Sequence, residues 1–335
     1  DLHHLSPMPP NRPLPRTAPL AKGQIAARNP LEGVRVLFFY DDREYYDRFY
    51  PILEMCGLRN VEKHDSVDTA VNQLIANDYD LLIFTYYQNT EQSDQLLAEI
   101  RELQLVNTLP VVAITEREAG LNNILWIFGL GVDEIIWPPL SASKLSRMVD
   151  SVMQQKRRQT YQRELRTAED LLESDKLDEA RQLLEVLESR GVAPLEVAIN
   201  LADLAIRQRD FPTATNNLNE AHRLAKEERN LVKKTYHLAR VTGLYGSFYI
   251  ARGRPEQAQR HLGSALSLNP HQPRAIEQLT AIHHEQGDVE AIQEIAQRFR
   301  KILPPFSPAL DAIAQPLLDM AERYEQLGMQ AKARE

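Results

Sequence analysis

The pattern of apolar and polar residues divides the chain into two parts with different periods. In the N-terminal part, continuous apolar runs at 34–39, 79–85 and 109–115 have the length and composition of buried strands. From Ser141 to about Ser174 there is no Pro or Gly, and apolar residues recur at helical spacing around a polar middle. We therefore expect the last helix of the first part to continue into the first helix of the second and to form a rigid joint.

The C-terminal part repeats. A small or aliphatic residue recurs near the start of every second predicted helix, at Ala180, Ala214, Ala258, Ile292 and Ala333. The spacing is 34 residues, with 10 and 7 residues inserted in the two longer intervals. Helix pairs that repeat in this way stack on one another, which predicts an α-helical solenoid with a concave groove.

Three stretches of the N-terminal part carry a family resemblance. Asp41 and Asp42 follow the run at 34–39, and the run at 79–85 ends on Thr85, at the end of a predicted buried strand. The stretch 131–140 follows the pattern Gly-Ala-Asp-Asp-aromatic-x-x-Lys-Pro-Phe position by position, but with Ile135 in place of the aromatic residue and Pro138 in place of Lys. These stretches resemble the receiver domain of bacterial response regulators. The resemblance implies an α/β fold, a doubly wound parallel five-stranded domain, over 33–153.

The same resemblance implies that the phosphorylation site is degenerate. Thr85 stands where the family has its acceptor aspartate, and Pro138 stands where it has lysine, whereas Thr115 keeps the family's hydroxyl. A phosphoaspartate requires a carboxylate nucleophile, a metal ion and a cation that pairs with the product. We therefore expect a pseudo-receiver without catalytic residues. Asp41 and Asp42 either retain a weak magnesium site or form a strand-end turn with a helix cap.

Two tyrosines follow Thr85 directly. Tyr86 and Tyr87 are expected in a neutral, exposed loop, and tyrosine is enriched at binding surfaces. This loop is a candidate contact patch for a partner. The alternative is that both side chains are ordinary packing or surface residues.

The repeats resemble the tetratricopeptide repeat, which is also a helix-turn-helix unit of 34 residues. The copy at about 239–272 matches best, with small, aromatic and proline residues in the family's positions. We expect about four repeats and a truncated fifth over 161–335. The fifth stops inside its second helix, so either the chain is trimmed or the natural protein continues. By resemblance, the groove holds a protein or peptide. Polar side chains expected on the first helix of each repeat are candidate contacts; the alternative is that each is a solvated surface residue. The candidates are Asn200, Asp203, Arg207, Gln278, His283 and Glu285.

Composition narrows the function class. The formal net charge of −8 gives no general attraction to nucleic acid or anionic membrane. The sequence has no apolar run long enough for a membrane span and no secretory signal, which favours a cytoplasmic location.

Cys56 is the single cysteine, so no internal disulfide is expected, and we interpret it as a packed residue of the first helix. The histidine pairs at 3–4 and 283–284 lack metal-ligand spacing, and no phosphate loop occurs. We expect no cofactor, no metal and no enzymatic activity.

Two segments outside the domains have their own composition. Residues 1–32 are rich in proline and poor in aromatic residues, which predicts a disordered tether; its PxxP spacing is an alternative docking motif. Residues 154–160 are expected to be a helical linker. The basic cluster at 156–158 is a solvated helix face or, alternatively, a nucleic-acid contact.

These observations favour a non-catalytic cytoplasmic adaptor or scaffold of bacterial two-component signalling. Its pseudo-receiver would act without phosphorylation, and its solenoid would bind a protein or peptide. Family resemblance adds a homodimer through the face at 131–153. The alternatives are a regulatory protein still switched by a ligand or by atypical phosphorylation, and a nucleic-acid-associated regulator, which the acidic balance opposes.

Overall fold

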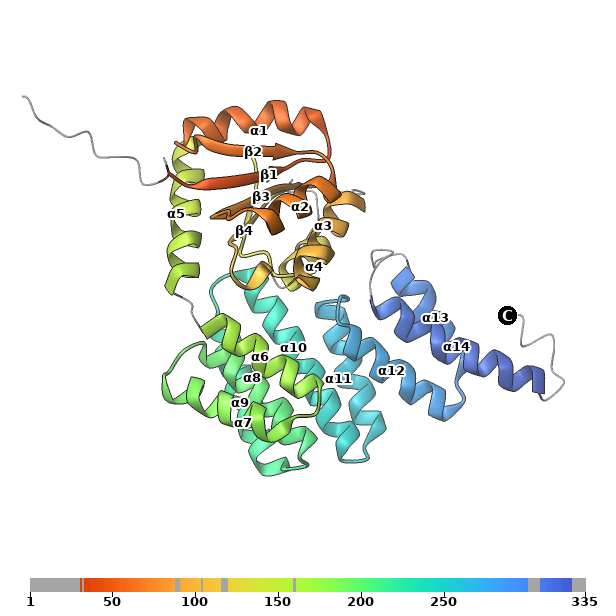
Figure 1. Cartoon of the computed structure of the whole chain (residues 1–335). Coiled ribbons are helices and arrows are strands. Elements are labelled where there is room, and N and C mark those ends of the chain that lie inside the picture. The colour runs from red at the N-terminus through yellow and green to blue at the C-terminus, as the bar shows by residue number, and fades with distance from the viewer. Residues whose placement is uncertain are drawn as a thin grey trace, which may run out of the picture.

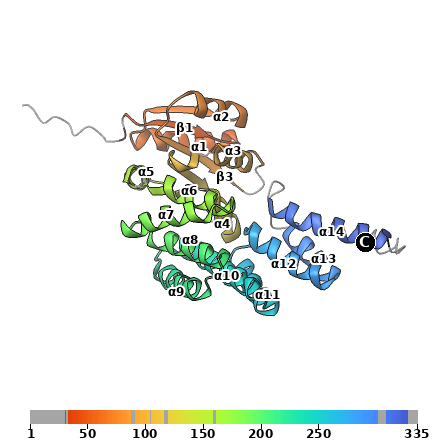
Figure 2. The same cartoon turned by 60° about the horizontal axis from the view of Figure 1, so that its bottom comes forward.

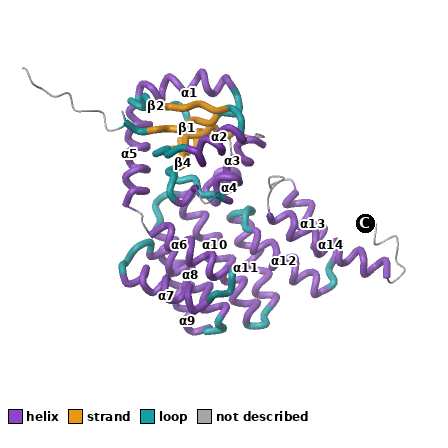
Figure 3. Tube along the Cα trace, viewed as in Figure 1, coloured by secondary structure: helices purple, strands orange, loops and turns teal. Residues whose placement is uncertain are grey.

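The computed structural model describes residues 31–326 except 32, 88–90, 104, 116–119, 159–160 and 301–307. The proline-rich tail at 1–30 and Ala333 of the fifth repeat therefore lie outside the described residues. The described chain forms an α/β unit, residues 31–158, and a helical array, residues 161–326 (Figure 1). Strands occur in the α/β unit, and the array is built from helices (Figure 3).

The α/β unit is built on a parallel five-stranded sheet with the order β2-β1-β3-β4-β5. This is the doubly wound order 2-1-3-4-5, as the sequence predicts. The central strands are buried on both faces, which explains their continuous apolar sequences. The edge strand β2 is partly exposed and correspondingly polar. The strands are β1 Arg35–Phe39, β2 Asn60–His64, β3 Leu81–Tyr86, β4 Val111–Thr115 and β5 Glu134–Ile136.

Helices cover both faces of the sheet. Helices α1 and α5 pack over one face with alternate strand residues such as Phe38 and Ile83. Helices α2, α3 and α4 cover the other face, where the neighbouring residues Phe39 and Phe84 point. Cys56 is buried at the end of α1, as predicted. The helices are α1 Arg43–Met55, α2 Val67–Ala76, α3 Glu91–Glu102, α4 Gly120–Gly129 and α5 Ala142–Arg158, with a short 3₁₀ turn η1 at Leu105–Asn107.

The helical array follows as consecutive helices that pack in pairs and then pair against pair (Figure 2). Its helices are α6 Tyr161–Glu173, α7 Leu177–Ser189, α8 Pro194–Arg207, α9 Phe211–Glu227, α10 Leu231–Ala251, α11 Pro255–Leu268, α12 Pro273–Gln286, α13 Val289–Arg300 and α14 Pro308–Gln326.

The turns of the array repeat with the predicted period. Ala180, Ala214, Ala258 and Ile292 are each the fourth residue of a helix, and each is fully buried. Five positions before each of them, a residue adopts the left-handed backbone conformation: Asp175 (φ 57°), Arg209 (φ 58°), Gly253 (φ 67°) and Gly287 (φ 71°). The same turn therefore connects the two helices in all four units, whether or not glycine is present.

The expected continuous helix between the two parts is wrong. Helix α5 ends at Arg158 and α6 begins at Tyr161, and the two helices point in different directions (Figures 1 and 2). The two parts are joined instead by packing. Helix α4 lies against α10, with the Phe128 ring edge-on to Tyr236 at 5.1 Å between centroids and Trp126 at 5.1 Å from His271.

Candidate functional sites

The carboxyl end of the sheet carries Asp41, which follows β1. Its Oδ1 accepts a hydrogen bond from the Thr85 hydroxyl at 3.2 Å, and its Oδ2 lies 3.3 Å from the Ser93 hydroxyl. Ser93 is buried at the start of α3 and also lies within hydrogen-bonding distance of the Thr85 carbonyl oxygen, at 2.9 Å. Both oxygens of Asp41 therefore face hydroxyl groups of the chain itself. The sequence did not single out Ser93, because it belongs to a helix that no motif aligns with β1.

The other residues of the predicted degenerate site do not join this cluster. The Asp42 carboxylate accepts from the Glu44 backbone N–H at 2.8 Å and caps α1, which is the helix-cap interpretation of this residue. Thr115 is buried at the end of β4, and its hydroxyl has no partner among the described residues. Pro138 follows β5 and is joined to Pro139 by a cis peptide bond. Among the described residues, no group of three His, Cys, Asp or Glu side chains is placed to hold a metal ion.

The expectation of an exposed aromatic loop is wrong. Tyr86 is the last residue of β3 and is 5% exposed, and Tyr87 is 6% exposed and stacks on Tyr45. The Tyr86 hydroxyl donates to Asp94 at 3.1 Å, and the Trp126 indole N–H donates to the same carboxylate oxygen at 2.8 Å. Burial raises the pKa of Asp94, while the two hydrogen bonds oppose that shift. These tyrosines form part of a buried network and offer no surface patch.

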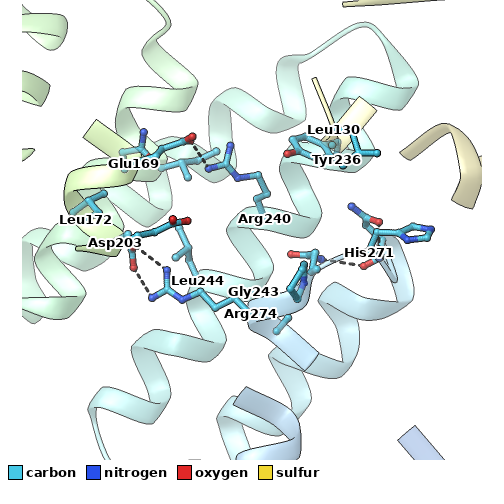
Figure 4. A pocket seen from close by; sticks show the side chains of 18 of the residues that line it. Leu130, Glu169, Leu172, Asp203, Tyr236, Arg240, Gly243, Leu244, His271 and Arg274 are labelled. Atoms are coloured by element: carbon cyan, nitrogen blue, oxygen red, sulfur yellow. Dashed lines mark hydrogen bonds and ion pairs between the residues drawn. The ribbon is translucent and has the colours of Figure 1, made fainter. Parts of the chain in front are cut away.

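A second candidate site lies between the α/β unit and the helical array. It is a cavity of about 620 Å³. Its walls come from α3 and α4 on one side and from α6, α8, α10 and α12 on the other. Figure 4 shows side chains of the second wall, among them Glu169, Asp203 and Arg274. Five arginines line it, namely Arg101, Arg166, Arg207, Arg240 and Arg274. The acids in its wall are Asp94, Glu102, Glu169, Glu173 and Asp203.

Asp203 is the most firmly held acid of the cavity. Arg274 binds it through two hydrogen bonds, at 2.7 and 2.8 Å, and Arg207 donates to it at 3.2 Å. Burial alone would raise the pKa of Asp203, but hydrogen bonds and charge from Arg274 and Arg207 lower it overall. The carboxylate is therefore ionised, and it links α8 to α12 (Figure 4).

Glu169 forms a second ionic group of the same kind. It lies 3.1 Å from Arg240 and 3.6 Å from Arg166, and it links α6 to α10. Each partner of the Asp203–Arg274 pair lies 34 positions after its counterpart in the Glu169–Arg240 pair. The two ion pairs are therefore the same contact made twice, one repeat apart.

The structure brings together four of the six groove residues predicted from the sequence. Asn200, Asp203, Arg207 and Gln278 line the cavity, and Gln278 accepts from the Ser247 hydroxyl at 2.9 Å. Two others do not. His283 is half-buried and lies 3.4 Å from Asp288, and Glu285 is exposed away from the cavity.

Sequence reasoning missed most of the charged lining. Arg101 and Trp126 come from the α/β unit, and nothing in the repeat pattern points to them. The repeat spacing points to Glu169, Arg240 and Arg274, because the acids at 169 and 203 are 34 residues apart, as are the arginines at 240 and 274. Among the helices of the described residues, none combines the length and the apolarity that crossing a bilayer requires.

Comparison with known proteins gives structural neighbours for part of the chain. No family model matches, and no curated protein matches. Solved structures include a response regulator receiver domain protein from Clostridium thermocellum, 19% identical, which covers 37% of this chain and 97% of its own with a TM-score of 0.32. A receiver domain protein from Methanospirillum hungatei JF-1 is 20% identical over 37% of this chain and 97% of its own, also with a TM-score of 0.32. A two-component response regulator from Clostridium difficile is 20% identical over 36% of this chain and 96% of its own, with a TM-score of 0.31. At these scores the fold class rests on the strand order and register described above.

Proposed function

We propose that this protein is a response-regulator-like signalling adaptor whose α/β unit works without phosphorylation. The observation that carries the proposal is the environment of Asp41. In a phosphorylatable site, a second carboxylate would stand at Thr85 and a metal ion would bind between the two. Here Thr85 and Ser93 face the two Asp41 oxygens instead.

The hydroxyls at this site do not replace the missing nucleophile. Thr85 is fully buried, and its hydroxyl proton is directed to Asp41. A threonine nucleophile needs a base that removes its proton and access for the phosphoryl donor. The second condition is absent for a side chain with no exposed surface. The site is therefore better suited to holding β1, β3 and α3 together than to transferring a phosphoryl group.

The helical array supports the binding half of the proposal. Its turns, its buried alanines and its ion pairs all recur at the repeat spacing, which is the behaviour of a tetratricopeptide solenoid. Such arrays bind proteins or peptides, so we propose that the array, with its exposed edges and outer surface, captures a protein partner. The resemblance-based homodimer through 131–153 stays a prediction, and light scattering of the purified chain tests it.

Phosphorylation is tested by incubating the full chain with acetyl phosphate and magnesium and measuring its intact mass. We expect no added phosphoryl group, because no acceptor carboxylate faces an open metal site. A stable adduct mapped to Asp41 or Asp42 would contradict the proposal and favour the regulated alternative.

Partner binding is tested by cross-linking the full chain in cells of its source and identifying the cross-linked residues by mass spectrometry. We expect protein cross-links to surface residues of the helical array. Recovery of nucleic acid without any protein partner would contradict the adaptor function and favour a nucleic-acid-associated regulator.

A further inference from the structure

The cavity between the α/β unit and the helical array has an excess of hydrogen-bond donors. Asp203 and Glu169 each interact with two arginines, and Asp94 accepts from Tyr86 and Trp126. The inner carboxylates are therefore already engaged. Glu102 and Glu173 remain, and their side chains are exposed.

Arg101 is the arginine of the cavity that has no carboxylate partner among the described residues. Its guanidinium donates to the Gly129 carbonyl oxygen at 3.3 Å, at the end of α4. Arg101 is an exposed residue of the cavity lining, so its guanidinium is accessible to a ligand that enters from solvent. A guanidinium remains charged in any protein environment, so a negative group would be stabilised beside it.

Two buried asparagines add neutral donors. Asn200 is 3% exposed and Asn269 is 1% exposed, and the Nδ2 amide group of each has no hydrogen-bond partner among the described residues. A buried amide without a partner destabilises the folded protein. The Oδ1 of Asn269 is fixed by the His271 backbone N–H at 3.0 Å, whereas no contact fixes the amide of Asn200, which can turn to present either end.

The cavity also has the size and the apolar surface of a small-molecule site. Its volume of about 620 Å³ lies in the usual range of about 300–1,000 Å³. Leu172, Ile199 and Leu244 contribute aliphatic surface, and Trp126 contributes an aromatic ring. The exposed acids Glu102 and Glu173 would repel a polyanion such as nucleic acid, which leaves anions of low charge.

We propose that this cavity binds a small organic anion, a carboxylate or a phosphate monoester with an apolar or aromatic part. Its anionic group pairs with Arg101, and its remaining acceptor oxygens take hydrogen bonds from Asn200 and Asn269. Because the ligand contacts both the α/β unit and the array, it holds them together. The site is independent of the protein partner proposed above, which binds the array from outside.

Binding is tested with three probes at millimolar concentration: benzoate, AMP and inorganic phosphate. Benzoate represents a carboxylate with an aromatic part, and AMP represents a phosphate monoester with an aromatic part. Inorganic phosphate represents an anion without an apolar part. The readouts are thermal unfolding and the fluorescence of Trp126, measured in a Trp137→Phe background so that one tryptophan reports. We expect benzoate or AMP to raise the melting temperature and change the fluorescence more than inorganic phosphate does.

Two variants assign the effect to this site. Arg101→Gln should weaken binding of the organic anion by about tenfold or more, because a charge-assisted hydrogen bond is lost. The matched control is Arg147→Gln on α5, since Arg147 also donates to one backbone carbonyl at 3.3 Å but lies outside the cavity. It should leave binding unchanged.

Asn200→Leu separates binding from folding. Without ligand, this variant should be as stable as the wild type or more stable, because an unpaired buried amide is replaced by an apolar side chain of similar size. Its affinity for the anion should fall. The proposal is overturned if neither organic probe binds, if inorganic phosphate binds as well as both, or if Arg101→Gln and Arg147→Gln bind equally.

Discussion

At the scale of single residues, the most consequential contacts are those of Asp41. The Thr85 hydroxyl donates to Asp41, and the Ser93 hydroxyl lies within hydrogen-bonding distance of both Asp41 and the Thr85 carbonyl oxygen. Thr85 supplies this hydrogen bond with a neutral side chain, whereas a metal site would need a second carboxylate at this position. A structural role and the loss of a metal site therefore have the same cause.

Thr85→Asp tests whether a second carboxylate beside Asp41 restores a metal site. The new carboxylate would be buried beside Asp41, so we expect a loss of about 2–4 kcal/mol in the free energy of unfolding at neutral pH. Magnesium should restore part of that stability, because a ligand that binds the folded state stabilises it. The measurement is urea unfolding with and without magnesium chloride.

Thr85→Val is the control for that experiment. It removes the same hydroxyl without adding charge, and we expect a loss of about 1 kcal/mol with no response to magnesium. A magnesium response of the wild-type chain as large as that of Thr85→Asp would show that Asp41 already holds the ion.

His271 gives the α/β unit and the array a pH-dependent contact. Burial lowers the pKa of His271 from 6.5 to about 4, so the ring is neutral in the folded protein at pH 7. Between these values the unfolded chain binds the proton and the folded chain does not, so stability falls as the pH drops below about 6.5. His271→Phe keeps a ring against Trp126 but cannot titrate.

The stability of His271→Phe should therefore fall less on acidification. We expect its loss between pH 7 and pH 4.5 to be smaller than that of the wild type by about 2 kcal/mol. Urea unfolding at the two pH values measures this difference. Equal losses would show that His271 is protonated in the folded protein.

At the scale of elements, apolar runs predicted the central strands of the sheet, and the repeat spacing predicted the turns of the array. Strands β1, β3 and β4 were visible because both of their faces are buried, whereas β2, with the polar sequence of an edge strand, gave no such run. The repeat spacing located the turns, because small residues at the fourth position of each second helix allow close packing. The break after α5 could not be predicted, since the segment 141–174 contains neither Pro nor Gly. The two helices pack on different partners, α5 on α1 and β5 and α6 on α7 and α8.

The close approach of α10 and α11 depends on a glycine. A Cβ at Gly246 would lie 2.5 Å from Leu262 Cδ2 and 2.6 Å from its Cγ, both on α11. We expect Gly246→Ala to destabilise the protein by about 1–3 kcal/mol, because the helices must move apart or Leu262 must leave its rotamer. Urea unfolding measures the change.

Gly263→Ala is the matched substitution on α11. A Cβ at Gly263 meets nothing within 4 Å, so the intrinsic helix preference of alanine should dominate. We expect a gain of about 0.5–1 kcal/mol. A loss at Gly263 equal to that at Gly246 would show that helix packing is not the cause.

At the scale of the whole molecule, aromatic contacts beside the cavity join the α/β unit to the array. Phe128 packs edge-on against Tyr236, and the Lys233 ammonium group lies 5.9 Å from the Phe128 ring centre. Phe128→Ala should loosen this contact and increase the radius of gyration measured by small-angle X-ray scattering. The secondary structure seen by circular dichroism should be unchanged.

Phe211→Ala is the control for the interface. Phe211 also packs edge-on against a ring, that of Phe248, with Arg252 5.8 Å from its centre, but both partners lie within the array. This variant should lower the melting temperature and leave the radius of gyration unchanged. An equal increase for both variants would mean that the two parts separate whenever the array is weakened.

The two ion pairs one repeat apart also limit how this array can change its length. Along α6, α8, α10 and α12 the paired positions read acid, acid, base, base, through Glu169, Asp203, Arg240 and Arg274. Each acid meets the arginine two units further on. Gain or loss of one internal unit by duplication or deletion would shift this order, so that at least one charged residue would lose its partner or meet a like charge. The charge order therefore makes such changes costly, because each would leave a partly buried charge without its partner.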